Sequence, residues 1–141
     1  MITITKRFRF EAAHKLKNYI GKCANLHGHS YKVDATFARK DFGFDNITGM
    51  VIDFHKLESI LEHFIGEEYD HHDITEFFGE LPATAEVIAY TIGVSIMESL
   101  NRVLERLSDF EGEIDIIEVK VWETDDSYAT WTNDYYTNMR R

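Results

Sequence analysis

Hydrophobic and polar residues alternate at the beginning of the chain. Because successive side chains of a strand point to opposite faces of a sheet, this period of two predicts a strand over residues 2–12 with one buried face. Its hydrophobic positions are Ile2, Ile4, Phe8 and Phe10. The same period returns over residues 27–38 and predicts a second strand, whose apolar face carries Tyr31, Val33, Ala35 and Phe37.

A helical period follows in the middle of the chain. Asp53 is a good N-cap residue, because its carboxylate can accept hydrogen bonds from the free amide groups of a first turn. Apolar residues then recur with helical spacing up to Ile65, and Gly66 suits the C′ position. The longest helix is expected to begin near Thr84, after the single proline, and to end near Ser108.

Two β-rich runs close the chain, over residues 114–122 and, more weakly, 128–136. The acidic stretch 66–83 between the two helices is expected to be irregular. The pattern therefore predicts an α+β fold with the element order ββααββ, in which a four-stranded antiparallel sheet carries two helices on one face. A length of 141 residues fits a single domain, residues 1–141.

Composition and charge narrow the class of protein. Nothing in the chain resembles a signal peptide, and no uninterrupted apolar run approaches the length of about 18 residues that marks a membrane span, so a cytoplasmic protein is expected. The net charge of −10 argues against nucleic acid or an anionic membrane as a partner. The charge is uneven, with +7 on residues 1–40 and −17 on the remainder. Lysines such as Lys15 are solvated outer positions, or they help a polyanionic substrate approach an acidic protein.

The segment from Cys23 to His29 concentrates reactive side chains. In a strand, His27 and His29 point to the same face, and His14 joins them if the first strand extends to it. Three histidines with an open fourth position suit a catalytic Zn²⁺ ion, although imidazole ligands also suit iron, cobalt and nickel. If Cys23 is the fourth ligand, the site is a closed structural zinc; if not, the thiol is a candidate base or nucleophile.

Two further features carry titratable groups. Adjacent Asp70 and His71 side chains do not meet easily, so this pair is a weak signal unless the loop brings it near Cys23. Glu123 ends a strand on the same face as apolar residues, where a carboxylate needs a cationic or donor partner. A ligand with a bidentate donor edge would satisfy Glu123; otherwise the strand ends there and the carboxylate is solvated.

Taken in order, the motifs form one set: Phe8-x-Phe10-x-Ala12-Ala13-His14, Cys23-x-x-x-His27-Gly28-His29-x-Tyr31, Gly49-Met50-Val51-Ile52-Asp53-Phe54, Asp70-His71-His72, Thr84-x-Glu86 and Glu123-Thr124. This set, from residue 4 to about residue 130, resembles the 6-pyruvoyl-tetrahydropterin synthase family. The spacer between Cys23 and His27 is similar to the 6-carboxy-tetrahydropterin synthase branch, which serves queuosine and other deazapurine synthesis. One departure is Ala83, which stands between Pro82 and Thr84 where the family usually has proline directly before the threonine.

The resemblance implies a tunnelling fold (T-fold) and a homo-oligomer, a hexamer or a tetramer, with active sites between subunits. It implies conversion of 7,8-dihydroneopterin triphosphate to 6-carboxy-5,6,7,8-tetrahydropterin, with release of acetaldehyde and triphosphate. The implied zinc ligands are His14, His27 and His29. Cys23 is the implied proton-transferring thiol, with Asp70 and His71 as its partners. The implied substrate contacts are Glu123 on the pterin ring, with Thr84 and Glu86 near that pocket. Lys15 is a candidate contact for the phosphates because of the basic charge of residues 1–40.

Two alternatives remain open from the sequence. A 6-pyruvoyl-tetrahydropterin synthase would use the same ligands and substrate, but it would eliminate triphosphate without breaking a carbon–carbon bond. A non-catalytic, zinc-stabilised binding module would coordinate the ion through Cys23 and would unfold when the metal is chelated. That second alternative leaves Asp70, His71 and Glu123 without a role.

Overall fold

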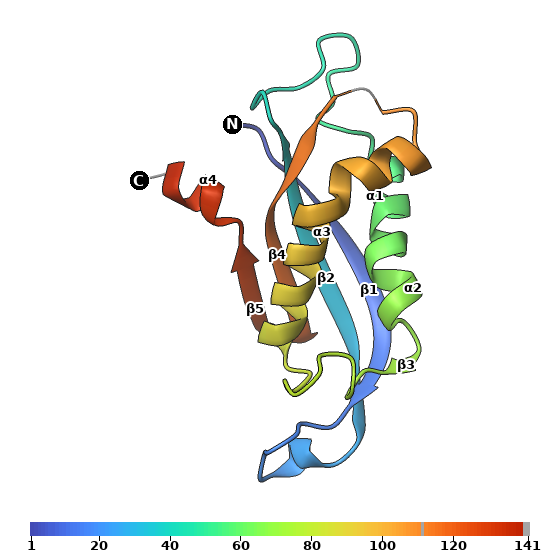
Figure 1. Ribbon diagram of the computed structural model, residues 1–141, viewed down its shortest axis with the longest axis vertical. Helices are drawn as coiled ribbons and strands as arrows, with labels where there is room; N and C mark the ends of the chain where they lie inside the picture. The colour runs from blue at the N-terminus through green and yellow to red at the C-terminus, as the bar shows by residue number, and fades with distance from the viewer. Residues whose placement is uncertain (111, 140–141) are drawn as a thin grey trace.

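The computed structural model describes residues 1–110 and 112–139. Its strands are β1 (Ile4–His14), β2 (His27–Arg39), β3 (His72–Asp73), β4 (Ile114–Thr124) and β5 (Ser127–Thr132). Its helical segments are the 3₁₀ turn η1 (Lys22–Ala24), α1 (Phe54–Leu61), the π-helical η2 (Glu62–Gly66), α2 (Glu67–Tyr69), α3 (Ala85–Leu107) and α4 (Asp134–Met139). The expected α+β class and its main order of elements are confirmed (Figure 1).

The strands form one sheet in the order β3-β1-β2-β4-β5. β1 and β2 are antiparallel along their whole length, from Ile4 opposite Phe37 to His14 opposite His27. β2 pairs with β4, and β4 with β5, in the same antiparallel sense. The four expected strands are therefore present, but the sheet has five strands and is mixed, because the short β3 runs parallel to β1 at one edge.

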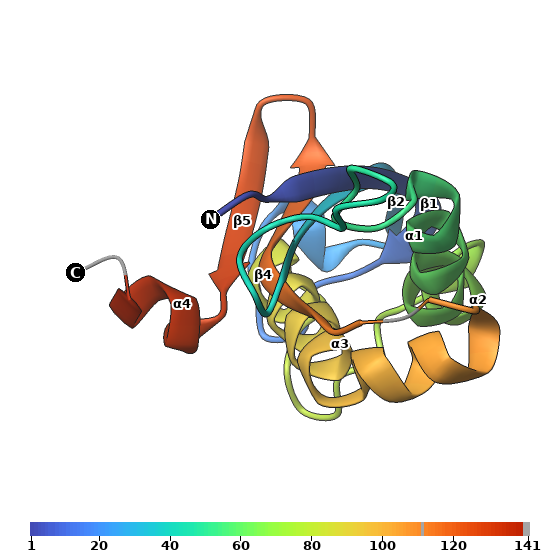
Figure 2. The same ribbon diagram turned by 90° about the horizontal axis from the view of Figure 1, so that it is seen from above.

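The hydrophobic core lies between the sheet and its helices. Figure 2 shows α1, α2 and α3 on the same face of the sheet. The apolar side chains of β1, β2 and β4 point toward these helices and form the core with them. By length and composition α3 would also pass as a membrane span, as the core helix of a soluble protein does, and here its apolar stripe is packed on the sheet. The largest fully buried side chains are Tyr31, Phe10, Phe37, Leu57, Ile60, Leu61, Ile65, Ile74, Ile88, Ile92, Ile96 and Leu104.

Two of the predicted elements end at a position that differs clearly from the sequence prediction. Gly66 does not end its helix, because it has right-handed helical dihedrals, φ −59° and ψ −52°, and the π-helical segment η2 carries the chain on into α2. The last strand ends at Thr132 instead of reaching residue 136. The side-chain amide of Asn133 donates to the carbonyl of Ile116, which turns the chain into α4.

Candidate active site

The β1–β2 hairpin brings three histidines together. Antiparallel pairing places His14 opposite His27, and His29 lies two residues further along the same face of β2. One ring nitrogen from each histidine lies within 4.8 Å of the other two. His14 is fully buried and the other two rings are partly buried, so the group is a polar cluster at the end of the apolar core.

Main-chain carbonyls fix the tautomers of two of these rings. Nδ1 of His14 lies 2.7 Å from the carbonyl oxygen of Ala83, and Nδ1 of His27 lies 2.7 Å from the carbonyl oxygen of Asn25. A carbonyl can only accept a hydrogen bond, so both Nδ1 atoms carry a proton and donate it. In the neutral rings both Nε2 atoms are then unprotonated, yet they face each other at 3.1 Å. Two lone pairs at that distance repel each other unless a cation lies against both.

His29 completes this arrangement. Its Nε2 is buried and has no hydrogen-bond partner among the residues that the structure describes. Burial lowers the pKa of His29 below its usual value, and the Glu123 carboxylate, 3.5 Å away, partly opposes that effect. A neutral His29 offers a further lone pair to the cluster, and a buried nitrogen without a partner is costly unless it finds one.

These observations fit a metal ion held by His14, His27 and His29. The separation of 3.1 Å between Nε2 of His14 and Nε2 of His27 is close to the separation of about 3.3 Å between two nitrogen ligands of tetrahedral zinc. Outer hydrogen bonds from ligand histidines to carbonyl groups are also typical of metal sites. Among the described residues, the group of three contains no Cys23, so the closed four-ligand site is not formed.

Glu123 lies beside this cluster. It stands at an irregularity in the pairing of β4 with β5, and its Oε1 lies 3.5 Å from Nε2 of His29. The carboxylate is 28% exposed, so it is neither fully buried nor fully solvated. Its location next to the histidines agrees with the face that strand alternation assigns to it.

Asp70 and His71 form a second polar group at the edge of the sheet. Nδ1 of His71 lies 3.0 Å from Oδ2 of Asp70, so the neighbouring side chains do meet, contrary to the expectation from the sequence. The backbone of His71 is left-handed at this contact, with φ of 61°. Glu11 of β1 holds the pair: its N–H donates to Oδ1 of Asp70 at 2.8 Å, and its carbonyl accepts from the N–H of His71 at 2.6 Å. That N–H from Glu11 is the main reason why the pKa of Asp70 lies below its usual value.

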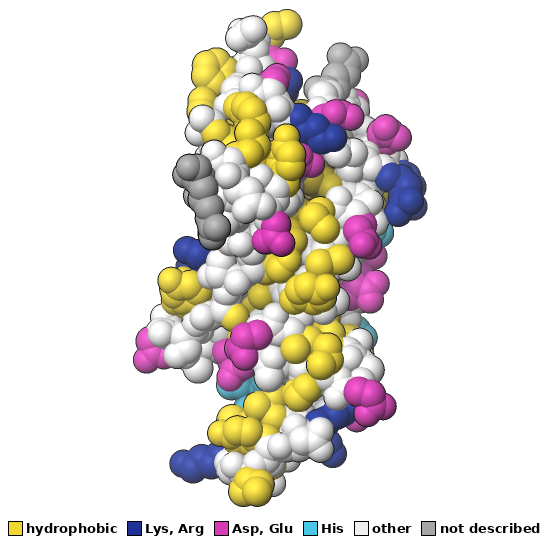
Figure 3. Space-filling model, turned by 60° about the vertical axis from the view of Figure 1, so that its left-hand side comes forward, with side chains coloured by type: hydrophobic (Ala, Val, Ile, Leu, Met, Phe, Trp, Pro, Cys, Tyr) yellow, Lys and Arg dark blue, Asp and Glu magenta, His cyan; other side chains and the backbone are white. Residues whose placement is uncertain are grey.

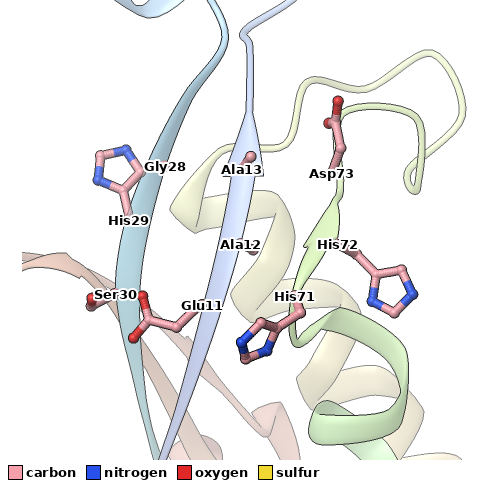
Figure 4. A pocket seen from close by; sticks show the side chains of 9 residues that line it. All are labelled: Glu11, Ala12, Ala13, Gly28, His29, Ser30, His71, His72 and Asp73. Atoms are coloured by element: carbon pink, nitrogen blue, oxygen red, sulfur yellow. Dashed lines mark hydrogen bonds between the residues drawn. The ribbon is translucent and has the colours of Figure 1, made fainter.

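His71 lines a cavity of about 440 Å³ on this edge of the sheet (Figure 4). Polar side chains from the hairpin also line it: Glu11 from β1, and His29 and Ser30 from β2, with the Ser30 hydroxyl donating to Glu11 at 2.7 Å. Because side chains alternate along β1, Glu11 points away from the face that holds His14. His29, a member of the histidine cluster, also lines this cavity, so the cavity and the cluster adjoin each other at the β1–β2 hairpin.

Cys23 stands apart from Asp70 and His71 within one chain. It lies in the turn η1, beyond the end of the hairpin, and its carbonyl accepts from the N–H of Leu16 at 2.8 Å. The thiol is free and partly exposed. Cys23 does not line the cavity with His71, and no hydrogen bond of the described residues joins it to Asp70 or His71.

The remaining predicted contacts lie near the start of α3 and the end of β1. Thr84 is the N-cap of α3, since its hydroxyl accepts from the N–H of Val87 at 3.2 Å. Glu86 is exposed in the first turn of that helix. Lys15 is exposed directly after β1, and its N–H donates to the hydroxyl of Thr75. Thr84 thus has a structural role that the motif alone does not show.

Three groups lie close to the histidines although the sequence assigned them no function. They are the carbonyls of Ala83 and Asn25 and the hydroxyl of Tyr31, which lies 3.3 Å from Nδ1 of His14. Strand parity does place Tyr31 on the face of His27 and His29. The carbonyl contacts have no side-chain signal, and Ala83 is 69 residues away from His14 in the sequence. Ala83, which departs from the family pattern, is therefore in direct contact with the histidine cluster.

Comparisons with known proteins show which family the chain is similar to. The family described as 6-pyruvoyl tetrahydropterin synthase matches residues 3–134. A Haemophilus influenzae protein named 6-carboxy-5,6,7,8-tetrahydropterin synthase is 30% identical over 139 residues, covering 93% of this chain and 99% of that protein. A Synechocystis protein with the same name is 37% identical over 102 residues, covering 70% and 78%. The solved structure of Caenorhabditis elegans 6-pyruvoyl tetrahydropterin synthase superposes with a TM-score of 0.71 at 23% identity, covering 94% of this chain and 95% of that chain, and shows the shared fold.

Proposed function

Because the chain belongs to the 6-pyruvoyl tetrahydropterin synthase family, we propose that it is a cytoplasmic 6-carboxy-tetrahydropterin synthase. In this proposal it converts 7,8-dihydroneopterin triphosphate to 6-carboxy-5,6,7,8-tetrahydropterin, releasing acetaldehyde and triphosphate, for the synthesis of queuosine or another deazapurine. The observation that carries the proposal is the convergence of three ring nitrogens beside the carboxylate of Glu123. The names of the relatives support the choice of branch.

The proposed metal is zinc, held by His14, His27 and His29. When bound, zinc supplies a Lewis acid that acidifies substrate hydroxyls and stabilises the negative charge that forms when a neighbouring carbon loses its proton. The chain's part is to turn a ring nitrogen of each histidine toward the ion: the Nδ1 hydrogen bonds of His14 and His27 leave the lone pair of each neutral ring on Nε2. Burial lowers the pKa of His29, which favours its neutral form.

The remaining side chains act on the substrate itself. Glu123 accepts hydrogen bonds from the amino-pyrimidine edge of the pterin, next to the ligand His29. The thiol of Cys23 takes and returns protons, and Asp70 orients the imidazole of His71 that exchanges a proton with it. Lys15 faces the phosphates. Glu86 lies near the ring pocket, where Thr84 acts by starting α3 at the correct place.

We further propose a homo-oligomer in which Cys23 of one chain meets Asp70 and His71 of another. The separation of the thiol from the cavity of His71 within one chain supports this arrangement. Exposed hydrophobic side chains also support an assembly: Figure 3 shows them distributed along the length of one face of the molecule. Large examples that are exposed in the single chain are Phe42, Phe44, Phe54, Tyr128 and Met139.

Product analysis tests the proposed reaction. Purified protein loaded with zinc should bind about one ion per chain and should turn dihydroneopterin triphosphate into a product with the mass of 6-carboxy-tetrahydropterin, with equimolar acetaldehyde. Cys23→Ala should lose turnover and keep its zinc, because the thiol is outside the group of three nitrogens.

Other outcomes separate the alternatives. Release of triphosphate without acetaldehyde would assign the 6-pyruvoyl reaction instead. Loss of zinc in Cys23→Ala, without turnover in the wild type, would indicate a structural site and a non-catalytic module.

A further inference from the structure

We propose that Tyr31 is a positioning residue of the metal site. Its buried hydroxyl, together with the carbonyl of Ala83, holds the ring of His14 so that Nε2 faces the other two histidines. This inference depends on the metal-binding part of the proposed function, but it does not depend on the reaction or on the identity of the substrate.

The side chain of Tyr31 packs against the rings of His14 and His29 from within the hydrophobic core. It is fully buried and follows His29 by two residues on the same face of β2. Its ring stacks on Phe10 with centroids 4.8 Å apart and planes 9° apart, and it meets the ring of His29 at a steep angle of 71° with centroids 5.5 Å apart. These contacts hold the ring, so the hydroxyl has a defined position 3.3 Å from Nδ1 of His14.

The position of one proton decides what the hydroxyl does. Nδ1 of His14 donates to the carbonyl of Ala83 at 2.7 Å, so it has no lone pair to accept a hydrogen bond from Tyr31. The Tyr31 oxygen, at 3.3 Å, is therefore a second and weaker acceptor of the same N–H. Both oxygens stabilise the tautomer in which Nδ1 is protonated, and this tautomer leaves the lone pair of His14 on Nε2.

Two acceptors are useful at this ring because Ala83 lies in a connecting segment. The carbonyl belongs to the stretch between Pro82 and the N-cap Thr84, whereas Tyr31 lies on a central strand that pairs on both sides. The strand contact keeps a hydroxyl acceptor beside His14 if the loop shifts. Outer hydrogen-bond partners of ligand histidines typically contribute about 10- to 100-fold to metal affinity. With a long bond as the second of two acceptors, we expect the lower end of that range.

Tyr31→Phe tests the role, because it removes the hydroxyl and keeps the stacked ring. The zinc dissociation constant, measured by competition with a chromogenic chelator, should rise by about tenfold. Tyr69→Phe is the matched control. Tyr69 is also a buried tyrosine packed against Phe10, with ring centroids 5.6 Å apart, and none of the hydrogen bonds of the described residues joins it to a histidine. Its variant should bind zinc within about twofold of the wild type.

A spectroscopic measurement tests the mechanism. In metal-free wild-type protein at a pH where the rings are neutral, long-range ¹H–¹⁵N correlation spectra should show His14 protonated at Nδ1. Tyr31→Phe should show an increased share of the Nε2-protonated form and a changed absorption spectrum with bound Co²⁺. A purely structural tyrosine would alter neither signal.

The possible failures are distinct. Protonation of His14 at Nε2 in the wild type, or an unchanged dissociation constant in Tyr31→Phe, would overturn the inference and leave the proposed function standing. A wild-type protein that binds no zinc would overturn the proposed function, and this inference with it.

Discussion

At the scale of single residues, Asp34 connects three strands of the sheet. Its carboxylate accepts two hydrogen bonds from Arg7 of β1, at 2.7 and 2.9 Å, and one from the indole N–H of Trp122 of β4, at 3.0 Å. Hydrogen bonds from Arg7 are the main reason why the pKa of Asp34 lies below its usual value. A carboxyl group with a lowered pKa in the folded state stabilises that state when it is ionised.

The sign of the pH dependence follows from this shift. The stabilisation is complete above the unfolded pKa of about 3.9 and is lost as pH falls through the lower folded value. Asp34→Asn should therefore reduce the free energy of unfolding by about 1 kcal/mol at neutral pH. The gap between variant and wild type should close as pH falls below about 4. Denaturant unfolding of metal-free protein at a series of pH values measures this gap.

Glu118→Gln is the control for Asp34→Asn. Glu118 belongs to the same sheet, and its carboxylate is paired with Lys120 at the longer distance of 3.7 Å. This variant should show a smaller gap at neutral pH. A gap for Asp34→Asn that persists unchanged into acid would mean that the carboxylate does not contribute through its ionised form.

The sequence predicts which side chains form the candidate site more readily than it predicts the contacts that those side chains make. The alternation of side chains along a strand was sufficient to place His27 and His29 on the same face of β2. The antiparallel pairing of β1 with β2 then places His14 opposite His27. The sequence could not assign the proton of His14, because the acceptor is a main-chain carbonyl of a distant residue. It predicted that the longest helix begins near Thr84 but did not assign the N-cap to this residue, since a threonine in a binding motif and a threonine at an N-cap look the same in a sequence.

At the scale of elements, the contact of α3 with β5 depends on a glycine. A Cβ atom added at Gly93 would lie 2.3 Å from ring carbons of Trp131, much closer than atoms can approach. Gly93→Ala should reduce the free energy of unfolding by about 1–2 kcal/mol, because overpacking exceeds the gain of about 1 kcal/mol in helix propensity. Denaturant midpoints at fixed protein concentration check this prediction.

Two further variants isolate the cause. At Gly66, a Cβ atom would meet the flexible carboxylate of Glu62, which can move away, so Gly66→Ala should stay within about 1 kcal/mol of the wild type. Trp131→Leu should relieve the clash, so the double variant with Gly93→Ala should be more stable than the sum of the two single changes. Additive losses would show that the helix and the strand do not collide at this point.

The elements found by sequence reasoning are those with several periods of hydrophobic pattern. β1, β2, β4, α1 and α3 fall within a few residues of their predicted ranges. The two-residue β3 is too short to show a period, and its pairing depends on Asp70 and His71 docking against Glu11. The π-helical η2 was missed because Gly66 resembles a helix end, although tertiary packing continues the helix beyond it.

At the scale of the whole molecule, the main question is whether one chain forms a complete site. Cys23 lies in the turn beyond the β1–β2 hairpin, while His71 lines a cavity at the sheet edge that does not include the thiol. If the proposed proton exchange takes place, Cys23 and His71 must come from different chains. A side chain that is needed from each of two chains makes activity a property of the assembly.

Mixed oligomers test this arrangement. Cys23→Ala chains coexpressed with His71→Asn chains should recover activity, although each variant alone is inactive; asparagine is chosen because it tolerates the positive φ of His71. If the assembly is random and equal, about a quarter of the shared sites hold both native side chains. Wild-type chains coexpressed with the double variant should also give about a quarter of the wild-type activity. Sites confined to one chain would give no recovery in the first mixture and about half of the activity in the second, which would contradict the shared site.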